Sequence, residues 1–279
     1  MIPSNDVRSR AVLVAAALLA GCGTFGETEA PRGDAGTASP DAIADAAAPP
    51  PPIDAGSSGL PTPDDCAMRG TTLDAQGFET MPPVGWTESD PEDLVTLDPD
   101  AEDVVSAPTS FRAGVLARSS GAANGTIART FPQALAGTLC ITFQGRLFVG
   151  PEGFGATPAN DFVGLFGADL AESAGAKVAV GVGVAIDQNG LRLHHQDGTR
   201  DVVSPSVAFG DDVTYQRWTL VIAPSARRAA FWIGANHVEM PFELPTQMAV
   251  LTIKLGVAAS GRVPAVTLHA EDLRVALLP

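Results

Sequence analysis

The clearest pattern along the chain is a strict alternation of residue types over residues 178–186. Valine or isoleucine occupies every second position of this segment. The positions between them hold only small residues, namely Ala179, Gly181, Gly183 and Ala185. A period of two over this length is typical of a β-strand with one buried face. We therefore expect the branched residues to face a hydrophobic core and the small residues to face away from it.

A turn signal and a second alternating segment follow at once. Asn189-Gly190 is typical of a tight turn, and Leu191, Leu193 and His195 then alternate with polar residues. Two alternating segments joined by such a turn predict a β-hairpin.

Strand-like segments recur along much of the remaining chain, and helical patterns are scarce. The segments are 139–143, 162–166, 217–222, 230–233, 250–257 and 266–277. Turn-forming residues lie between them, which favours a β-sandwich or barrel over alternating strands and helices. The sequence therefore predicts an all-β domain.

The last segment, 266–277, changes phase along its length. Its first apolar residues, up to Ala270, fall on even positions, and those from Leu273 onward fall on odd positions. A strand cannot move its apolar side chains to the other face without an extra residue. We therefore expect a β-bulge near Glu271 and Asp272.

The first 22 residues have the features of an export signal. Arg8 and Arg10 precede a short run of small apolar residues, which is too short to span a bilayer as a helix. Leu19-Ala20-Gly21-Cys22 resembles the lipobox of bacterial lipoproteins. The resemblance implies that residues 1–21 are removed, that Cys22 carries lipid, and that the protein is anchored in the cell envelope. Gly23 after the cysteine favours the outer membrane under the sorting rule of that family.

Residues 22–63 read as a tether and residues 64–279 as one folded domain. The tether is rich in Ala, Asp, Gly, Pro, Ser and Thr and contains four consecutive prolines from Pro49 to Pro52. Such a segment cannot bury enough apolar surface to offset the entropy of ordering, so we expect it to be disordered. The following length suits a single large all-β domain.

Charge narrows the range of partners. The chain has 17 basic and 32 acidic residues and a formal net charge of −15. Removing residues 1–21 takes away Arg8, Arg10 and Asp6, which leaves 15 basic and 31 acidic residues and a net charge of −16. Nucleic acids and anionic lipid surfaces require basic patches, so the charge argues against both as partners.

The cysteine count leaves one pair. The chain has three cysteines, and lipid on Cys22 would leave Cys66 and Cys140 in an oxidising compartment. They either form a disulfide or remain as two buried thiols. The sequence alone does not place their Cα atoms close enough for a bond.

The strand pattern resembles concanavalin A-like, or laminin-G-like, jelly-roll sandwiches. The resemblance rests on Gly77-Phe78-Glu79, on Trp218 to Ile222 followed by Ala230 to Gly234, and on the two closing strands. Galactose-binding-like sandwiches are the nearest alternative. In that family, a Glu near the start and an Asp in the last strand share a structural calcium, which implies a candidate pair in Glu79 and Asp272.

No motif for catalysis stands out. Glu88-Ser89-Asp90-Pro91-Glu92 spells the carboxylate string of some glycosidases, but Pro91 disfavours a central strand, so a solvated loop is expected. The acidic run of Asp98, Asp100, Glu102 and Asp103 lacks the spacing of a calcium loop. The four histidines, which we expect to be exposed strand residues, show no zinc spacing; they are His194, His195, His237 and His269. Of the tryptophans, Trp218 and Trp232 are expected in the core, and each could instead stack on a sugar, as could Trp86.

The small-residue face of 178–186 is the main candidate binding surface. Glycine weakens a strand interior, so Gly181 and Gly183 need a reason, either another element lying against them or a shallow groove for a ligand. The favoured hypothesis is a non-catalytic binding module on the cell envelope, for a glycan or an envelope protein. A polysaccharide-cleaving enzyme and a purely structural component are the alternatives.

The lipobox yields a direct prediction. Mass spectrometry of the mature protein should find a diacylated or triacylated cysteine at Cys22, and Cys22→Ser should move the protein from the membrane to the soluble fraction. An unmodified N-terminus at another residue would rule out the lipoprotein assignment.

Overall fold

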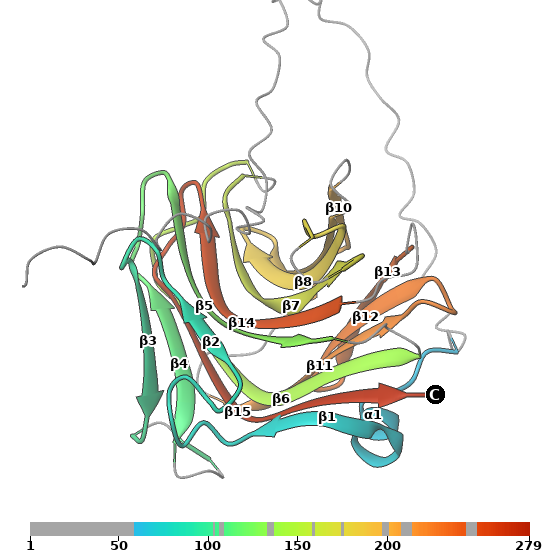
Figure 1. Ribbon diagram of the computed structural model, residues 1–279. Coiled ribbons are helices and arrows are strands. Elements are labelled where there is room, and N and C mark those ends of the chain that lie inside the picture. The colour runs from blue at the N-terminus through green and yellow to red at the C-terminus, as the bar shows by residue number, and fades with distance from the viewer. Residues whose placement is uncertain are drawn as a thin grey trace, which may run out of the picture.

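The described part of the chain is a β-sandwich with one short helix. The computed structural model describes residues 59–279, apart from residues 103, 106–108, 133–136, 158–159, 174–175, 197–200, 208–213 and 244–249. Within this part, antiparallel strands form one sheet of eight strands and one of seven (Figure 1). The predicted all-β, jelly-roll sandwich is therefore confirmed.

The eight-stranded sheet has the order β13-β12-β11-β6-β15-β4-β3, with β1 also paired to β15. Its strands are β1 (Thr71–Gln76), β3 (Val95–Asp100), β4 (Ser110–Val115), β6 (Thr138–Val149), β11 (Gln216–Ala223), β12 (Arg228–Ile233), β13 (Asn236–Pro241) and β15 (Val266–Leu278).

The seven-stranded sheet has the order β10-β9-β8-β7-β14-β5-β2. Its strands are β2 (Thr87–Ser89), β5 (Ala122–Phe131), β7 (Phe162–Ala171), β8 (Val180–Asp187), β9 (Gly190–Gln196), β10 (Asp201–Val203) and β14 (Val250–Ser260). The predicted hairpin is the β8–β9 pair, in which Asp187 pairs with Gly190. Its two turn residues are Gln188 and Asn189, one position earlier than expected.

An aromatic cluster fills the space between the sheets. The centroid of the Trp218 ring lies 5.7 Å from that of Phe143 and 5.6 Å from that of Phe231. The Phe143 and Phe166 rings meet edge-on, with their centroids 4.8 Å apart. Trp218 and Phe143 come from the eight-stranded sheet and Phe166 from the seven-stranded sheet, so the cluster joins the two layers. Full burial of each such ring contributes about 2–3 kcal/mol, so this contact is a large part of what holds the layers together.

The predicted bulge in the last strand is present. The pairing of β15 with β6 shifts register between Glu271 and Arg274, and Asp272 has a φ of 51°. Residues on both sides of the shift, Ala270 and Leu273, therefore face the same core. Glu271 at the bulge is buried, and its carboxylate accepts a hydrogen bond from the Val105 amide at 2.7 Å.

The folded region begins before the predicted boundary at residue 64. Leu60 is already buried against Ala223 and Ala230, and helix α1 (Pro63–Arg69) includes the last residue assigned to the tether. Cys22, the signal region and most of the tether lie outside the described residues. No helix in the described part is long and apolar enough to cross a membrane.

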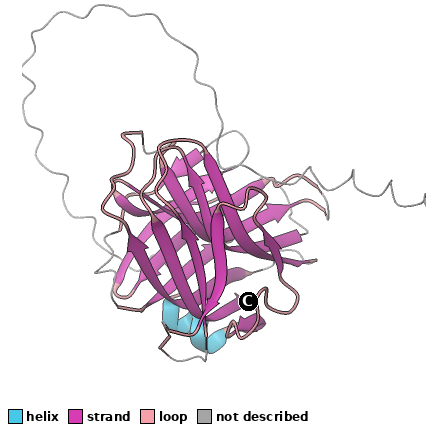
Figure 2. Cartoon of the chain, turned by 90° about the vertical axis from the view of Figure 1, so that its left-hand side faces the viewer, coloured by secondary structure: helices cyan, strands magenta, loops and turns pink. Residues whose placement is uncertain are grey.

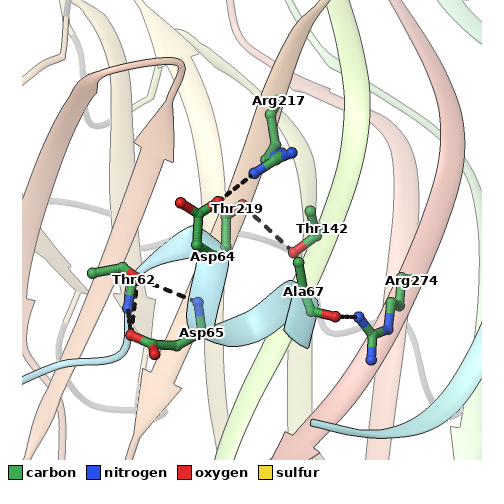
Figure 3. Close-up of polar contacts among 8 residues, drawn as sticks. All are labelled: Thr62, Asp64, Asp65, Ala67, Thr142, Arg217, Thr219 and Arg274. Atoms are coloured by element: carbon green, nitrogen blue, oxygen red, sulfur yellow. Dashed lines mark hydrogen bonds and ion pairs between the residues drawn. The ribbon is translucent and has the colours of Figure 1, made fainter. Parts of the chain in front are cut away.

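Helix α1 is fastened to the outer face of the eight-stranded sheet (Figure 3). Thr62 caps the helix by accepting from the Asp65 amide, and the hydrogen bonds from Thr62 hold the pKa of the Asp65 carboxyl below its ordinary value. Arg217 of β11 donates to Asp64 at 2.8 Å, and Arg274 of β15 donates to the Ala67 carbonyl. The start of the domain is thus held by two strands of the sheet.

A disulfide completes this attachment. Cys66 of α1 and Cys140 of β6 are bonded, with their Cα atoms 5.8 Å apart and 74 residues apart in sequence. Of the two possibilities that the sequence left open, a disulfide or two buried thiols, the structure thus has the disulfide. The bond joins the first turn of the folded chain to a central strand of the sheet.

Removing the disulfide should destabilise the domain. Replacing Cys66 and Cys140 together by alanine should lower the free energy of unfolding by about 2–4 kcal/mol, because a long closed loop regains its entropy in the unfolded chain. Urea denaturation without reductant measures this difference. Met68→Ala, an exposed change in the same helix, should leave the midpoint unchanged. Equal midpoints for the double variant and the native chain would contradict the prediction.

Candidate functional site

The outer face of the seven-stranded sheet is the first candidate surface. In Figure 1 the strands of this sheet bend, and the face turned away from the eight-stranded sheet lies on the inside of the bend. Val180, Val182 and Val184 belong to the core, as predicted, so the residues between them lie on the outer face.

The four small residues predicted for this face are not equivalent. Ala179 precedes β8 and packs against the core, so its assignment to the outer face is wrong. Its amide donates to the Leu170 carbonyl, which marks the entry into the strand. Gly183 and Ala185 are buried, whereas Gly181 is half-buried.

The close approach of β7 and β8 explains one glycine on each strand, Gly167 and Gly183. A Cβ on Gly167 would lie 2.5 Å from the Val182 carbonyl oxygen, and one on Gly183 would lie 3.0 Å from the Phe166 carbonyl oxygen. Side chains at these positions would push the two backbones apart. Gly183 is therefore required by the close approach of the neighbouring strand β7, which is the first of the two reasons weighed from the sequence, although the element is a paired strand and not a loop lying on the sheet.

Gly181 has a different environment. The nearest atom to an added Cβ is Asp169 Oδ1 at 3.3 Å, the end of a side chain that can move, and no backbone atom lies within 4 Å. Gly181 is thus the one position among the predicted four at which a larger side chain would project from the sheet without displacing a strand.

Polar side chains extend from Gly181 across the sheet. Gly181 pairs with Asp169, Asp169 with Thr252, and Thr252 with Thr130, so one row crosses four strands. The hydroxyls of Thr252 and Thr130 lie 3.0 Å apart, and Asp169 forms an ion pair with Lys254 of the next row. The row places acceptors, donors and hydroxyls beside an open glycine.

The β8–β9 end of the same face carries a second ion pair. Arg192 Nε lies 3.2 Å from Asp187 Oδ2, and the Asp187 carboxylate is almost fully buried. The ring of His194 lies 5.2 Å from that of Phe162, and both are buried. These side chains make the far end of the face more tightly packed than the region around Gly181.

The expectation of exposed histidines is wrong for three of the four. His194, His195 and His269 are buried, and only His237 is exposed. Aromatic neighbours explain part of this, since His195 meets Phe242 edge-on at 5.3 Å and His194 lies against Phe162. Alternation along one strand does not reveal such neighbours.

Both residues of the candidate calcium pair, Glu79 and Asp272, have exposed side chains. Glu79 lies in the loop after β1, and Asp272 lies in the bulge of β15, close to where Gln76 pairs with Leu273. Among the described residues, no three His, Cys, Asp or Glu side chains gather in a way that could hold a metal. Calcium binding by Glu79 and Asp272 stays a prediction.

The two acidic strings hold loops and strands in place. Asp90, in the middle of the glycosidase-like string, accepts from the amides of Leu94 and Val95 at 3.2 Å each. Asp98 and Asp100 of the second run lie 3.0 and 3.6 Å from the Arg112 guanidinium. The run's last member, Asp103, lies outside the described residues.

The tryptophans mostly serve the fold. Trp218 is in the core, and Trp86 is buried and donates to Asp74 Oδ2 at 2.7 Å. Trp232 is half-buried on the outer face of the eight-stranded sheet and stacks on His237 at 5.6 Å. None of the three lies on the row of polar residues beside Gly181.

A groove lies on the opposite side of the sandwich and was missed by sequence reasoning. Its volume is about 640 Å³, and its lining includes Arg112, Arg146, Phe148 and Thr267. These residues come from β4, β6 and β15. The available signal was the alternation of β4, in which Phe111, Ala113 and Val115 face the core and Arg112 and Gly114 face outward, but that strand was not recognised.

Comparison with solved structures identifies the same fold in other proteins. The chain is similar to the endo-β-1,4-glucuronan lyase of the fungus Trichoderma reesei, with a TM-score of 0.56 and 12% identity, over 74% of this chain and 96% of that chain. It is also similar to the cellulose-induced protein Cip1, with a TM-score of 0.51 and 12% identity, over 73% of this chain and 96% of that chain. No family model and no curated protein matches the sequence. At this identity the likeness shows the β-sandwich fold.

Substitution of Gly167 and of Gly181 should change the stability of the domain by different amounts. Gly167→Ala should lower the free energy of unfolding by about 1–3 kcal/mol, because its Cβ overlaps the β8 backbone. Gly181→Ala should change it by less than about 1 kcal/mol, because the added methyl meets only the Asp169 side chain. Urea denaturation of both variants measures the contrast. Equal losses at the two sites would show that the Gly181 position is also covered.

Proposed function

We propose that this chain is a non-catalytic, carbohydrate-binding β-sandwich displayed on the cell envelope, and that the glycan lies on the outer face of the seven-stranded sheet. The observation that carries the proposal is the row Gly181, Asp169, Thr252 and Thr130, with Lys254 paired to Asp169.

The chemistry of this row suits sugar hydroxyls. A carboxylate accepts, an ammonium donates, and a threonine hydroxyl does both, so neighbouring hydroxyls of one ring would find complementary partners. The Asp169–Lys254 pair is already formed, so its two side chains need little further ordering to receive a ligand. Gly181 leaves space for the ring to approach the backbone.

The similar structures support a glycan more than another ligand. One of them is named for cleavage of glucuronan and the other for induction by cellulose. Both names concern polysaccharides, although the shared fold does not carry either activity to this chain.

The envelope location rests on the sequence. A lipid on Cys22 and a long tether before the folded domain would hold the binding face away from the membrane surface. Gly23 favours the outer membrane for this anchor. The domain would then meet either envelope polysaccharide or an external glycan.

A polysaccharide-cleaving enzyme is the second candidate, because one similar structure is named a lyase. Incubating the protein with the glycans it binds, and following unsaturated products and new reducing ends, separates the two candidates. Turnover that Asp169→Asn abolishes would replace the binding proposal by an enzymatic one.

A glycan array tests the binding proposal. The native chain should bind a subset of neutral glycans, and Gly181→Gln should weaken that binding at least tenfold by placing an amide side chain over the row. Thr252→Val, which removes one hydroxyl at constant shape, should weaken it by roughly threefold to tenfold. Thermal midpoints of both variants should stay near the native value.

The matched control is Val84→Gln, which adds the same side chain at an exposed loop position. It should bind as the native chain does. Native-level binding by a folded Gly181→Gln variant would place the glycan elsewhere, and no binding to any glycan, with or without calcium, would contradict the proposal.

A further inference from the structure

The groove on the eight-stranded sheet is built from two rows of outward-facing side chains. In the first row, Asp98, Arg112, His269 and Arg146 pair in turn across β3, β4, β15 and β6. In the second row, Thr96, Gly114, Thr267 and Phe148 pair across the same strands. β3 and β4 lie on the left-hand side of Figure 1, which faces the viewer in Figure 2, whereas β15 and β6 extend along the bottom of Figure 1 toward the right.

Exposed apolar side chains concentrate at this groove. Leu94, Leu116 and Phe148 line it and are 42%, 81% and 40% exposed, and the described residues include only four other large hydrophobic side chains with comparable exposure. Exposed apolar groups that gather in one concave place, with polar groups beside them, are typical of a binding surface.

Gly114 places no side chain in the groove, so the groove is deeper at this position. Gly114 lies between Thr96 and Thr267 in the second row, and its backbone is extended, so any residue could occupy the position. An added Cβ would lie 3.3 Å from Thr267 Oγ1, and its next neighbours are more than 3.7 Å away. No backbone constraint therefore explains this glycine, in contrast to Gly167.

The arginines are held in defined orientations. Asp98 and Asp100 flank the Arg112 guanidinium at 3.0 and 3.6 Å, and Arg146 lies over the Tyr215 ring at 5.7 Å. A guanidinium fixed by an aromatic face presents its N–H groups in one plane, which suits a carboxylate. The groove lining holds two arginines and one acid, Asp93, in a chain of net charge −15.

Arg146 and Phe148 stand two residues apart on the same face of β6. That spacing places their attachment points about 7 Å apart. The apolar face of a sugar ring can rest on Phe148 while a carboxylate on the ring reaches Arg146, and the hydroxyls of Thr96 and Thr267 are at hand for the remaining groups.

We propose that this groove is a second saccharide site, separate from the face around Gly181, and that it selects sugars that carry a carboxylate. Phe148 supports the ring, Arg146 binds the carboxylate, and Gly114 leaves room for the ring to approach the sheet. The two sites lie on opposite faces of the sandwich, so one anchored domain can bridge an acidic and a neutral glycan.

Calorimetric titration of the whole protein with tetragalacturonate and with its fully methyl-esterified form tests the proposal. The ester lacks the negative charge and carries one more methyl group at each carboxyl, while the rings and their hydroxyls are the same. The native chain should bind the acid at least tenfold more tightly than the ester, and added salt should weaken only the binding of the acid. Arg146→Gln should bring the two affinities to within about threefold, and Arg146→Lys should retain part of the preference.

Two further variants separate this site from the first. Gly114→Gln should abolish binding of both probes and leave neutral-glycan binding at the Gly181 face unchanged, whereas Gly181→Gln should have the reverse effect. Phe148→Ala truncates an exposed side chain and should weaken both probes about tenfold without affecting the thermal midpoint, so the test holds even if Gly114→Gln fails to fold.

Equal affinity of the native chain for the acid and the ester would overturn the selection for a carboxylate. Failure to bind either probe, or native affinity in the folded Phe148→Ala variant, would overturn the groove as a saccharide site. None of these results affects the proposed neutral-glycan site, because its test uses other ligands and Gly181→Gln.

Discussion

The pairing of β6 with β15 in the middle of the eight-stranded sheet is the interaction on which the rest of the structure depends. The two strands pair from Val149 and Val266 at one end to Thr138 and Leu278 at the other, with one bulge. The pairing brings the last strand of the chain beside a strand from its middle. Three features use β6: the core through Phe143, the attachment of the helix through Cys140, and the groove through Arg146 and Phe148.

Alternation along β6 assigns these features to different sides. Phe143 and Leu147 face the seven-stranded sheet, and Cys140, Arg146 and Phe148 face outward. The bulge at Glu271 and Asp272 keeps the core face of β15 continuous although its apolar residues move from even to odd positions. The groove and the attachment of α1 therefore share the outer face of one sheet at different points along its strands.

Several acidic residues of the chain stabilise the fold through hydrogen bonds and ion pairs. Asp74 accepts from Trp86 and forms an ion pair with Arg129, and Asp161 accepts from the amides of Thr157 and Arg262. Asp90 closes the turn before β3 in the same manner. A carboxylate that accepts two or more such hydrogen bonds is held in place and lends rigidity to a loop. The glycosidase-like string thus contributes to the fold, which explains why its carboxylates do not lie together on a strand face.

The sequence alone determined the features that depend on local periodicity. The β8–β9 hairpin, the bulge near Asp272 and the all-β class follow from the alternation of side chains, because neighbouring residues of a strand must face opposite sides. β4 was not recognised although its alternation is intact, because only three apolar residues carry it, and β5 was missed because an Asn-Gly pair interrupts its alternation. Only the tertiary structure decided which residues of different strands meet. It separated Gly183, which β7 crowds, from Gly181, which stands open, and it buried three of the four histidines against distant neighbours. It also aligned Arg112, His269 and Arg146, which are far apart in sequence, because cross-strand register depends on the packing of the whole sandwich and not on any one segment.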